Sequence, residues 1–106
     1  MCCYIANMRP KHTKSNTLER TLEKRFVSEI KKRGGLAIKM PGNIMTGIPD
    51  RLVILPGGRI VFVELKRDTG RVSKIQAHVH KLLLDLGCHV EVLFGRDQID
   101  EFLDNY

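Results

Sequence analysis

Glu64 and Lys66 place a carboxylate and an amine at one end of the strand that the run RIVFVELK (59–66) predicts. The interior of this run is apolar in both phases, which predicts a central strand covered on both faces. Residues two apart on a strand point to the same side, and burying both charges costs desolvation unless something compensates them. The pair therefore indicates either a structural salt bridge or part of a reactive site.

Asp50 favours the reactive site. It opens the run RLVIL (51–55), and the turn residues 56–58 predict a hairpin between the two runs. In an antiparallel hairpin the start of the first strand lies beside the end of the second, so we expect Asp50 close to Glu64 and Lys66. Two converging carboxylates suit a hard divalent cation such as Mg²⁺, which lowers the pKa of a water. A nearby lysine can orient that water.

Apolar residues three and four apart predict an amphipathic first helix, which Thr17 caps and Gly34 and Gly35 end. The apolar residues are Leu18, Leu22, Phe26, Val27 and Ile30. LAIKM (36–40) predicts the first strand of the sheet. A glycine-rich stretch with Pro41, residues 41–49, predicts the loop that leads to Asp50.

Ser73 begins a second predicted helix, and Gly87 stops it. Its apolar stripe is formed by Ile75, Val79, Leu82, Leu83 and Leu86. CHVEVLF (88–94) predicts a fourth strand, and Asp97 can cap a short last helix. The order α-β-β-β-α-β-α predicts an α/β fold with a mixed sheet flanked by helices.

Length and charge narrow the class of protein. The 106 residues support one domain, which we place at 16–106 behind a flexible basic arm at 1–15. No run approaches the ~18–20 apolar residues of a membrane span, which excludes channels and predicts no membrane partner. Residues 1–40 hold ten basic and three acidic side chains, whereas residues 71–106 hold four and six. This basic excess indicates an anionic partner, with nucleic acid first, or a solvated basic face.

Cysteines and histidines do not form a recognisable metal motif. Cys2, Cys3 and Cys88 are an odd number without a disulfide framework, which indicates a reducing compartment such as the cytoplasm. Neither a C-x-x-C nor an H-x₃-H spacing occurs, so structural zinc is not predicted. His80 lies four residues after Gln76 and could reach the site edge, although a half-exposed helix histidine is the simpler interpretation.

GIPDR (47–51), the hairpin and VELK (63–66) together resemble the PD-(D/E)xK nuclease signature. Within that superfamily the chain is most similar to stand-alone VRR-NUC (virus-type replication-repair nuclease) domains over residues 17–103. The resemblance implies a restriction-endonuclease-like αβββαβ core. It also implies that Asp50 and Glu64 bind Mg²⁺ or Mn²⁺, with the Leu65 carbonyl as a further ligand, and that Lys66 is the catalytic lysine.

The resemblance assigns two more positions. Gln76 matches the family's glutamine on the helix after the hairpin, and a glutamate of the first helix completes the site. Glu19 and Glu23 are four apart and share a helix face. By its spacing to Gly34 we slightly prefer Glu19, but the choice stays open, and either could be an ordinary surface glutamate.

The activity that the resemblance implies is metal-assisted phosphodiester hydrolysis that leaves a 5′ phosphate. Small family members resemble Holliday-junction resolvases, which implies a homodimer acting on four-way DNA junctions in a bacterial or phage-infected cytoplasm. The expected phosphate contacts are Lys39, Arg51, Arg67, Arg71 and Lys74. The alternatives are a nuclease of this fold that cuts flap, single-stranded or linear DNA, and a non-catalytic nucleic-acid-binding module.

Overall fold

The computed structural model describes residues 13–106, and the side chains from Leu18 onward. Its elements, in chain order, are α1 (Thr13–Lys32), β1 (Leu36–Lys39), β2 (Arg51–Leu55), β3 (Arg59–Lys66), α2 (Lys74–Asp85), β4 (His89–Phe94) and α3 (Gly95–Asp104). This is the predicted order of elements. Most of the predicted arm, residues 1–12, lies outside the described residues, and the boundary between arm and domain stays a prediction.

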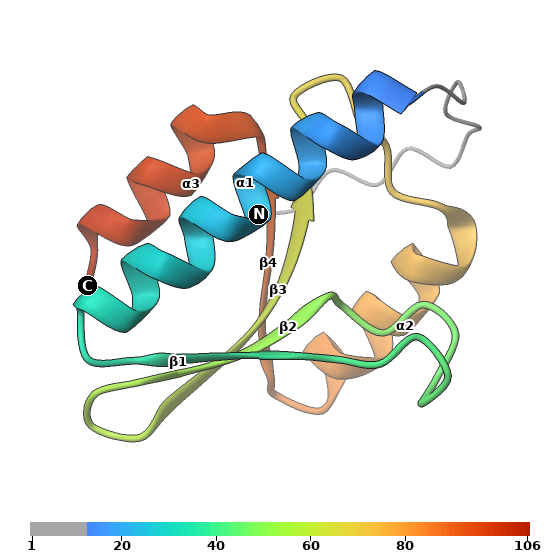
Figure 1. Ribbon diagram of the computed structural model, residues 1–106. Coiled ribbons are helices and arrows are strands. Elements are labelled where there is room, and N and C mark those ends of the chain that lie inside the picture. The colour runs from blue at the N-terminus through green and yellow to red at the C-terminus, as the bar shows by residue number, and fades with distance from the viewer. Residues whose placement is uncertain (1–12) are drawn as a thin grey trace.

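The four strands form one mixed sheet, as expected, and their order in it is β1-β2-β3-β4 (Figure 1). β1 pairs antiparallel with β2, and β2 pairs antiparallel with β3. β4 lies parallel to β3 because the chain crosses over through α2 before it returns to the sheet. The predicted α/β class is confirmed, and β3 is the central strand that carries Glu64 and Lys66.

The hairpin between β2 and β3 follows from its turn residues. Gly57 and Gly58 both have positive φ, at 88° and 78°, which residues with a Cβ rarely adopt. The amide of Gly58 donates to the carbonyl of Leu55 at 3.0 Å. The turn fixes the register, so Arg51 lies opposite Val63 and the residue before β2 reaches the last residues of β3.

One face of the sheet is covered by α1 and α3, which lie side by side above it in Figure 1. The core on this face holds Phe26 and Ile30 of α1, Ile99 and Phe102 of α3, and the alternating residues Val61, Val63 and Leu65 of β3. Each fully buried large side chain contributes about 1.5–3 kcal/mol from burial. This face anchors the strand that carries the candidate site.

α2 lies on the opposite face of the sheet (Figure 1) and packs against β4. Of its predicted apolar stripe only Val79 is buried, while Ile75, Leu82 and Leu86 are exposed and Leu83 is half-buried. Their spacing places these residues on one stripe of the helix, as predicted. Most of the stripe stays exposed because α2 packs only against the β4 side of the sheet. His80 is fully buried, so the half-exposed histidine expected from the sequence is wrong.

Two predicted helix starts differ from the structure. α1 begins at Thr13 rather than at a Thr17 cap, because the polar stretch TKSNT offers several residues at which a helix can start. α3 begins at Gly95, and Asp97 lies in its first turn rather than at its cap. There the side-chain oxygen of Gln98 accepts from the Phe94 amide at 2.9 Å, which satisfies the helix end without a cap from Asp97. No helix within residues 13–106 is long and apolar enough to cross a bilayer.

Candidate active site at the end of β3

The structure brings Asp50, Glu64 and Lys66 together where β2 begins and β3 ends. The amide of Leu65 donates to Oδ2 of Asp50 at 3.1 Å, which ties the loop carboxylate to the strand. Nζ of Lys66 lies 3.3 Å from Oε2 of Glu64. The amide of Met40 donates to the backbone carbonyl of Asp50 at 2.8 Å, so the loop is held from both sides.

Gln76 joins this group from α2. Ser73 caps the helix, and its side-chain oxygen accepts from the Gln76 amide at 3.2 Å. In return Oε1 of Gln76 accepts from the Ser73 amide at 2.9 Å, which completes a capping box. The box orients the side-chain amide, so that Nε2 of Gln76 donates to Oε2 of Glu64 at 3.2 Å. The cap that starts the helix therefore also positions a hydrogen-bond donor in the candidate site.

Burial and mutual repulsion control the charge of the two acids. Glu64 is 1 % exposed, and burial followed by the Asp50 charge raises its pKa to about 8, against the opposing effect of Lys66. Burial also raises the pKa of Asp50, which the Leu65 amide and Lys66 partly offset. Both shifts mean that one added positive charge would stabilise the doubly ionised pair.

The acids fit a hard divalent cation. Oε1 of Glu64 is buried and has no hydrogen-bond partner among the described residues. Because the N–H and C=O of a strand residue face the same edge, the Leu65 carbonyl lies on the side of Asp50. Within residues 13–106 no three His, Cys, Asp or Glu side chains gather closely enough to hold a metal alone. Two carboxylates and one backbone carbonyl suit Mg²⁺ or Mn²⁺, which bind through few carboxylates and keep several waters.

The two glutamates of α1 differ in their surroundings. Glu23 lies near enough to contribute to the raised pKa of Asp50. Its Oε2 pairs with Nη2 of Arg51 at 3.0 Å and with Nζ of Lys39 at 3.3 Å. Glu19 lies one turn earlier on α1 and is half-buried. The geometry therefore relates Glu23 to the candidate site, whereas the spacing to Gly34 slightly favoured Glu19.

Comparison with known proteins places the chain in a family. No protein-family model matches the chain. It is 43% identical over 79 residues to "Putative nuclease p44" of Acyrthosiphon pisum secondary endosymbiont phage 1, covering 74% of this chain and 85% of the relative. A solved structure described as "VRR_NUC domain" matches with a TM-score of 0.69 and 31% identity, covering 90% of this chain and 99% of that one. The chain belongs to the VRR-NUC family.

The residues expected to contact DNA in this VRR-NUC domain fall into two groups. Arg51 has only 13 % of its side chain exposed, and both it and Lys39 pair with Glu23. Arg71 and Lys74 are exposed, and Arg67 is half-buried, along the loop that leads into α2. The second group is therefore the more accessible to a phosphate backbone.

A basic hollow beside the site was not predicted residue by residue. It has a volume of about 470 Å³, and Arg20, Lys24 and Lys31 of α1 line it together with Glu23 and Arg51. The charge count of residues 1–40 indicated a basic surface, but it did not show which side chains form it. The hollow gives this VRR-NUC domain a basic surface on the α1 side of the candidate site.

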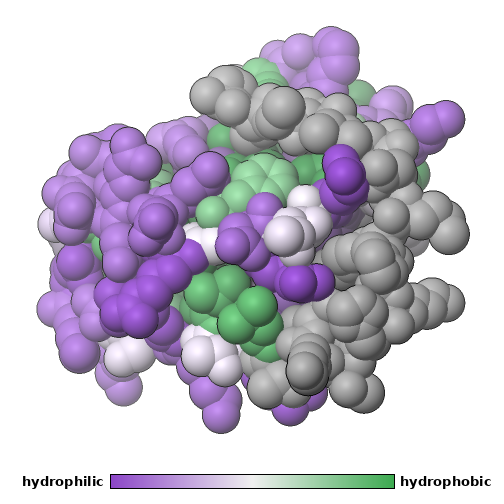
Figure 2. Space-filling model, turned by 90° about the horizontal axis from the view of Figure 1, so that it is seen from above, coloured by the Kyte–Doolittle hydropathy of each residue, from purple (hydrophilic) through white to green (hydrophobic). Residues whose placement is uncertain are grey.

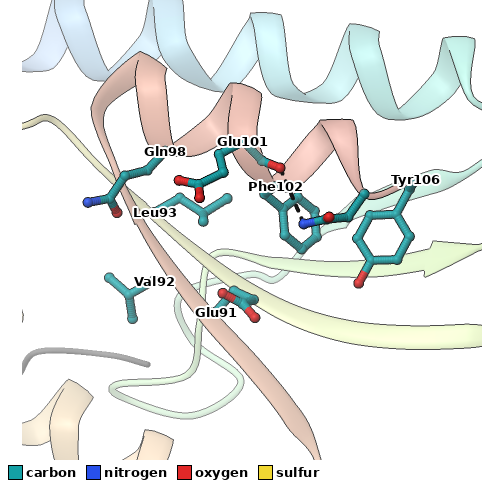
Figure 3. Close-up of a pocket in the computed structure, with 8 residues that line it drawn as sticks. Glu91, Val92, Leu93, Gln98, Glu101, Phe102 and Tyr106 are labelled. Carbon is teal, nitrogen blue, oxygen red and sulfur yellow. Dashed lines mark hydrogen bonds between the residues drawn. The ribbon is translucent and has the colours of Figure 1, made fainter.

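A second hollow, of about 380 Å³, lies between β4 and α3 (Figure 3). Glu91 of β4 and Glu101 of α3 line it, beside the apolar side chains of Val92, Leu93 and Phe102. Negative charge at this place disfavours a phosphate group. The hollow is therefore a poor candidate for the nucleic-acid site of the VRR-NUC domain.

Proposed function

We propose that this VRR-NUC nuclease is a metal-dependent, structure-selective DNA endonuclease that acts as a homodimer on four-way junctions. The observation that carries the proposal is the convergence of Asp50, Glu64, Lys66 and Gln76 at the end of β3. A solitary salt bridge would need neither Asp50, the second, half-buried acid, nor the glutamine. Family membership and the phage relative support a nuclease that works in the bacterial cytoplasm.

In the proposed reaction, Asp50, Glu64 and the Leu65 carbonyl would hold Mg²⁺ or Mn²⁺. The ion supplies Lewis-acid catalysis and offsets charge on the phosphoryl oxygens. Lys66, held 3.3 Å from Glu64, orients the attacking water and stabilises the negative charge that develops. Gln76 keeps Glu64 in place through its hydrogen bond. Attack at phosphorus breaks the bond to the 3′ oxygen and leaves a 5′ phosphate.

We assign DNA binding to basic residues on either side of these acids. Arg20, Lys24 and Lys31 line the hollow on α1. Arg71 and Lys74 flank the start of α2, where backbone amides favour a phosphate. We expect these groups to recognise backbone and shape rather than base sequence. A four-way junction needs two cuts, which two copies of one small domain supply.

The direct experiment compares cleavage of a four-way junction with cleavage of a linear duplex of the same sequence, with Mg²⁺, Mn²⁺ or EDTA. We expect the junction to be cut preferentially and only with metal. Lys66→Ala should lower the rate by at least ~10² while the protein stays folded, because it removes a charged group at the reacting centre.

Lys81→Ala is the matched control, because Lys81 is an exposed lysine of α2 whose ion pair with Asp85 is local to the helix. It should cut at the wild-type rate. Metal-dependent cutting of flap, single-stranded or linear DNA at equal or higher rates would reassign the substrate. Binding without any cutting by the folded wild type would favour a non-catalytic module and contradict the enzyme.

A further inference from the structure

The loop between β1 and β2 exposes two large apolar side chains beside the candidate site. Ile44 is 59 % exposed and Met45 is 44 % exposed. The ten residues 40–49 contain no charged side chain, although 28% of the whole chain is charged. A single exposed apolar residue is ordinary, whereas two adjacent ones on a loop that leads into a candidate active site indicate contact with an apolar part of a ligand.

The backbone of this loop holds the two side chains in place. The amide of Ile44 donates to the Pro41 carbonyl at 3.2 Å. The amide of Ile48 donates to the Met45 carbonyl at 3.1 Å, so Ile44 and Met45 lie where two consecutive turns meet. Just beyond them, a Cβ at Gly47 would lie 2.7 Å from a backbone oxygen of α2, and the loop lies beside this helix in Figure 1. The tip is therefore fixed against the helix.

The tip lies close to the atoms that would react. Ile44 precedes Asp50 by six residues, which span at most about 20 Å when fully extended and less across two turns. The Met40 amide donates to the Asp50 carbonyl at 2.8 Å, which closes the loop at the candidate site. Phosphates of one strand follow one another at about 3.4 Å along the DNA axis, so the tip lies within about six base steps of a phosphate at Asp50. DNA held for cleavage is thus within reach of the tip.

The chemistry of the tip decides which part of the DNA it can contact. Phosphates are bound by cationic side chains and polar donors, which the side chains of Ile44 and Met45 do not offer. The apolar part of a nucleic acid is its base stack, and isoleucine and methionine are among the side chains that insert between base steps. Lys74 is exposed on the first turn of α2, where the loop packs, and can hold a neighbouring phosphate.

We propose that Ile44 and Met45 form an apolar wedge that inserts into the base stack of the bound DNA where the stack is interrupted, as at a branch point. The proposal rests on the proposed function and adds the feature of the DNA that is recognised. Opening a continuous duplex costs stacking and pairing energy, whereas a mismatched or branched step has already lost part of it. The wedge therefore selects interrupted DNA without reading the identity of its bases.

The test measures unstacking directly and needs no cleavage. A four-way junction carries 2-aminopurine beside the branch point, and a linear duplex carries it at the matching position. The fluorescence of this base rises when it leaves the stack. Protein is added without metal in a Lys66→Ala background. We expect fluorescence to rise with the junction but not with the duplex, and the double variant Ile44→Ser, Met45→Ser to lose the rise. Ile44→Ser alone serves if the double variant does not fold.

Cleavage with Mg²⁺ and an intact Lys66 gives a second measurement. The double variant should cut the junction about tenfold more slowly, because the open step is no longer held. Its rate on the linear duplex and the salt dependence of its binding should not change, since no phosphate contact is lost. Leu86→Ser is the matched control, because Leu86 is 80 % exposed at the other end of α2. It should keep both the fluorescence rise and the wild-type rates.

A rise that persists in the folded double variant, or no rise with the intact loop, would overturn the wedge. Equal losses of rate on junction and duplex together with a lower melting temperature would give Ile44 and Met45 a structural role and contradict it as well. The proposed function fails separately. Unstacking without any cutting retains the wedge and refutes the nuclease activity, whereas preferential cutting of junctions that ignores both substitutions does the reverse.

Discussion

Glu64 shows how far residue-level reasoning from the sequence extends. Its position at the end of a central strand, and its approach to Asp50 across the hairpin, both follow from apolar runs and a turn. The hydrogen bond that Gln76 donates to Glu64 does not follow from these patterns, because the capping box at the start of α2 positions that donor. His80 was wrongly expected to be half-exposed, because spacing gives its helix face but not the depth at which that face is covered.

The raised pKa of Glu64 makes the metal-free protein sensitive to pH. The folded state binds a proton up to about pH 8, whereas the unfolded carboxyl releases it near its ordinary value of 4.5. Stability should therefore fall as pH rises from about 4.5 to about 8. We expect the melting temperature in EDTA to decline over this range, and Glu64→Gln, which stays neutral, to flatten the decline. Parallel declines in both proteins would contradict a buried, protonated Glu64.

Metal should act in the opposite direction. A divalent ion favours both carboxylates in the ionised form, so Mg²⁺ or Mn²⁺ should raise the melting temperature more at pH 8 than at pH 5. Asp50→Asn should remove most of that increase, because it replaces one charged ligand by a neutral amide. Glu101→Gln is a suitable control, since Glu101 is an exposed acid that lines the hollow between β4 and α3. An equal response in all three proteins would indicate nonspecific ion binding.

At the scale of elements, the strands and the hairpin could be predicted because each depends on a short local pattern. The start of α2 at Ser73 could also be predicted, but the starts of α1 and α3 could not, since several polar residues in TKSNT compete for one cap and Gln98 replaces the cap expected from Asp97. The stripe of α2 is a different failure. Its periodicity was correctly detected, but a helix pattern does not state how much of the stripe the sheet covers.

The loop before β2 depends on a glycine that lets it pack on α2. Gly47 has φ of 91°, and a Cβ there would lie 2.7 Å from the Ile75 carbonyl oxygen and 2.9 Å from Cγ2 of Val79. Gly47→Ala should therefore destabilise the fold by about 1–3 kcal/mol, the cost of left-handed strain and overpacking. It should also slow cleavage, because the loop leads directly to Asp50. Thermal unfolding and junction cleavage measure the two effects.

Gly42 in the same loop is the control. A Cβ there would meet nothing within 4 Å, and its φ lies outside the left-handed region. Gly42→Ala should change stability by less than ~0.5 kcal/mol and leave cleavage unaltered. If both variants behaved alike, the effect would come from general loop stiffening rather than from the close approach of Gly47 to α2.

At the scale of the whole molecule, the basic hollow and the exposed apolar side chains of the sheet lie on different sides. The sequence showed that the first 40 residues are basic, but only the fold shows that Arg20, Lys24 and Lys31 line one hollow beside the candidate site. Seen from the α1 and α3 side, the described surface shows many hydrophilic side chains around a smaller hydrophobic patch (Figure 2). The exposed side chains of Leu36, Ile38 and Ile60 share the opposite face of the sheet, on the side of α2. The basic hollow can therefore bind an anionic backbone without burying these apolar side chains.

The basic hollow predicts how DNA affinity depends on salt. Each phosphate neutralised by a cationic side chain contributes about −0.9 to the slope of log K against log salt concentration. Arg20→Ala with Lys24→Ala should weaken binding to junction and duplex alike and reduce the slope by about two for each bound copy, if both side chains contact phosphates. Binding is measured by fluorescence anisotropy without metal in a Lys66→Ala background, so that cleavage cannot interfere. Lys81→Ala, which removes a lysine from α2, should leave the slope unchanged. An unchanged slope in the double variant would move the DNA path from α1 to the loop that carries Arg67 and Arg71.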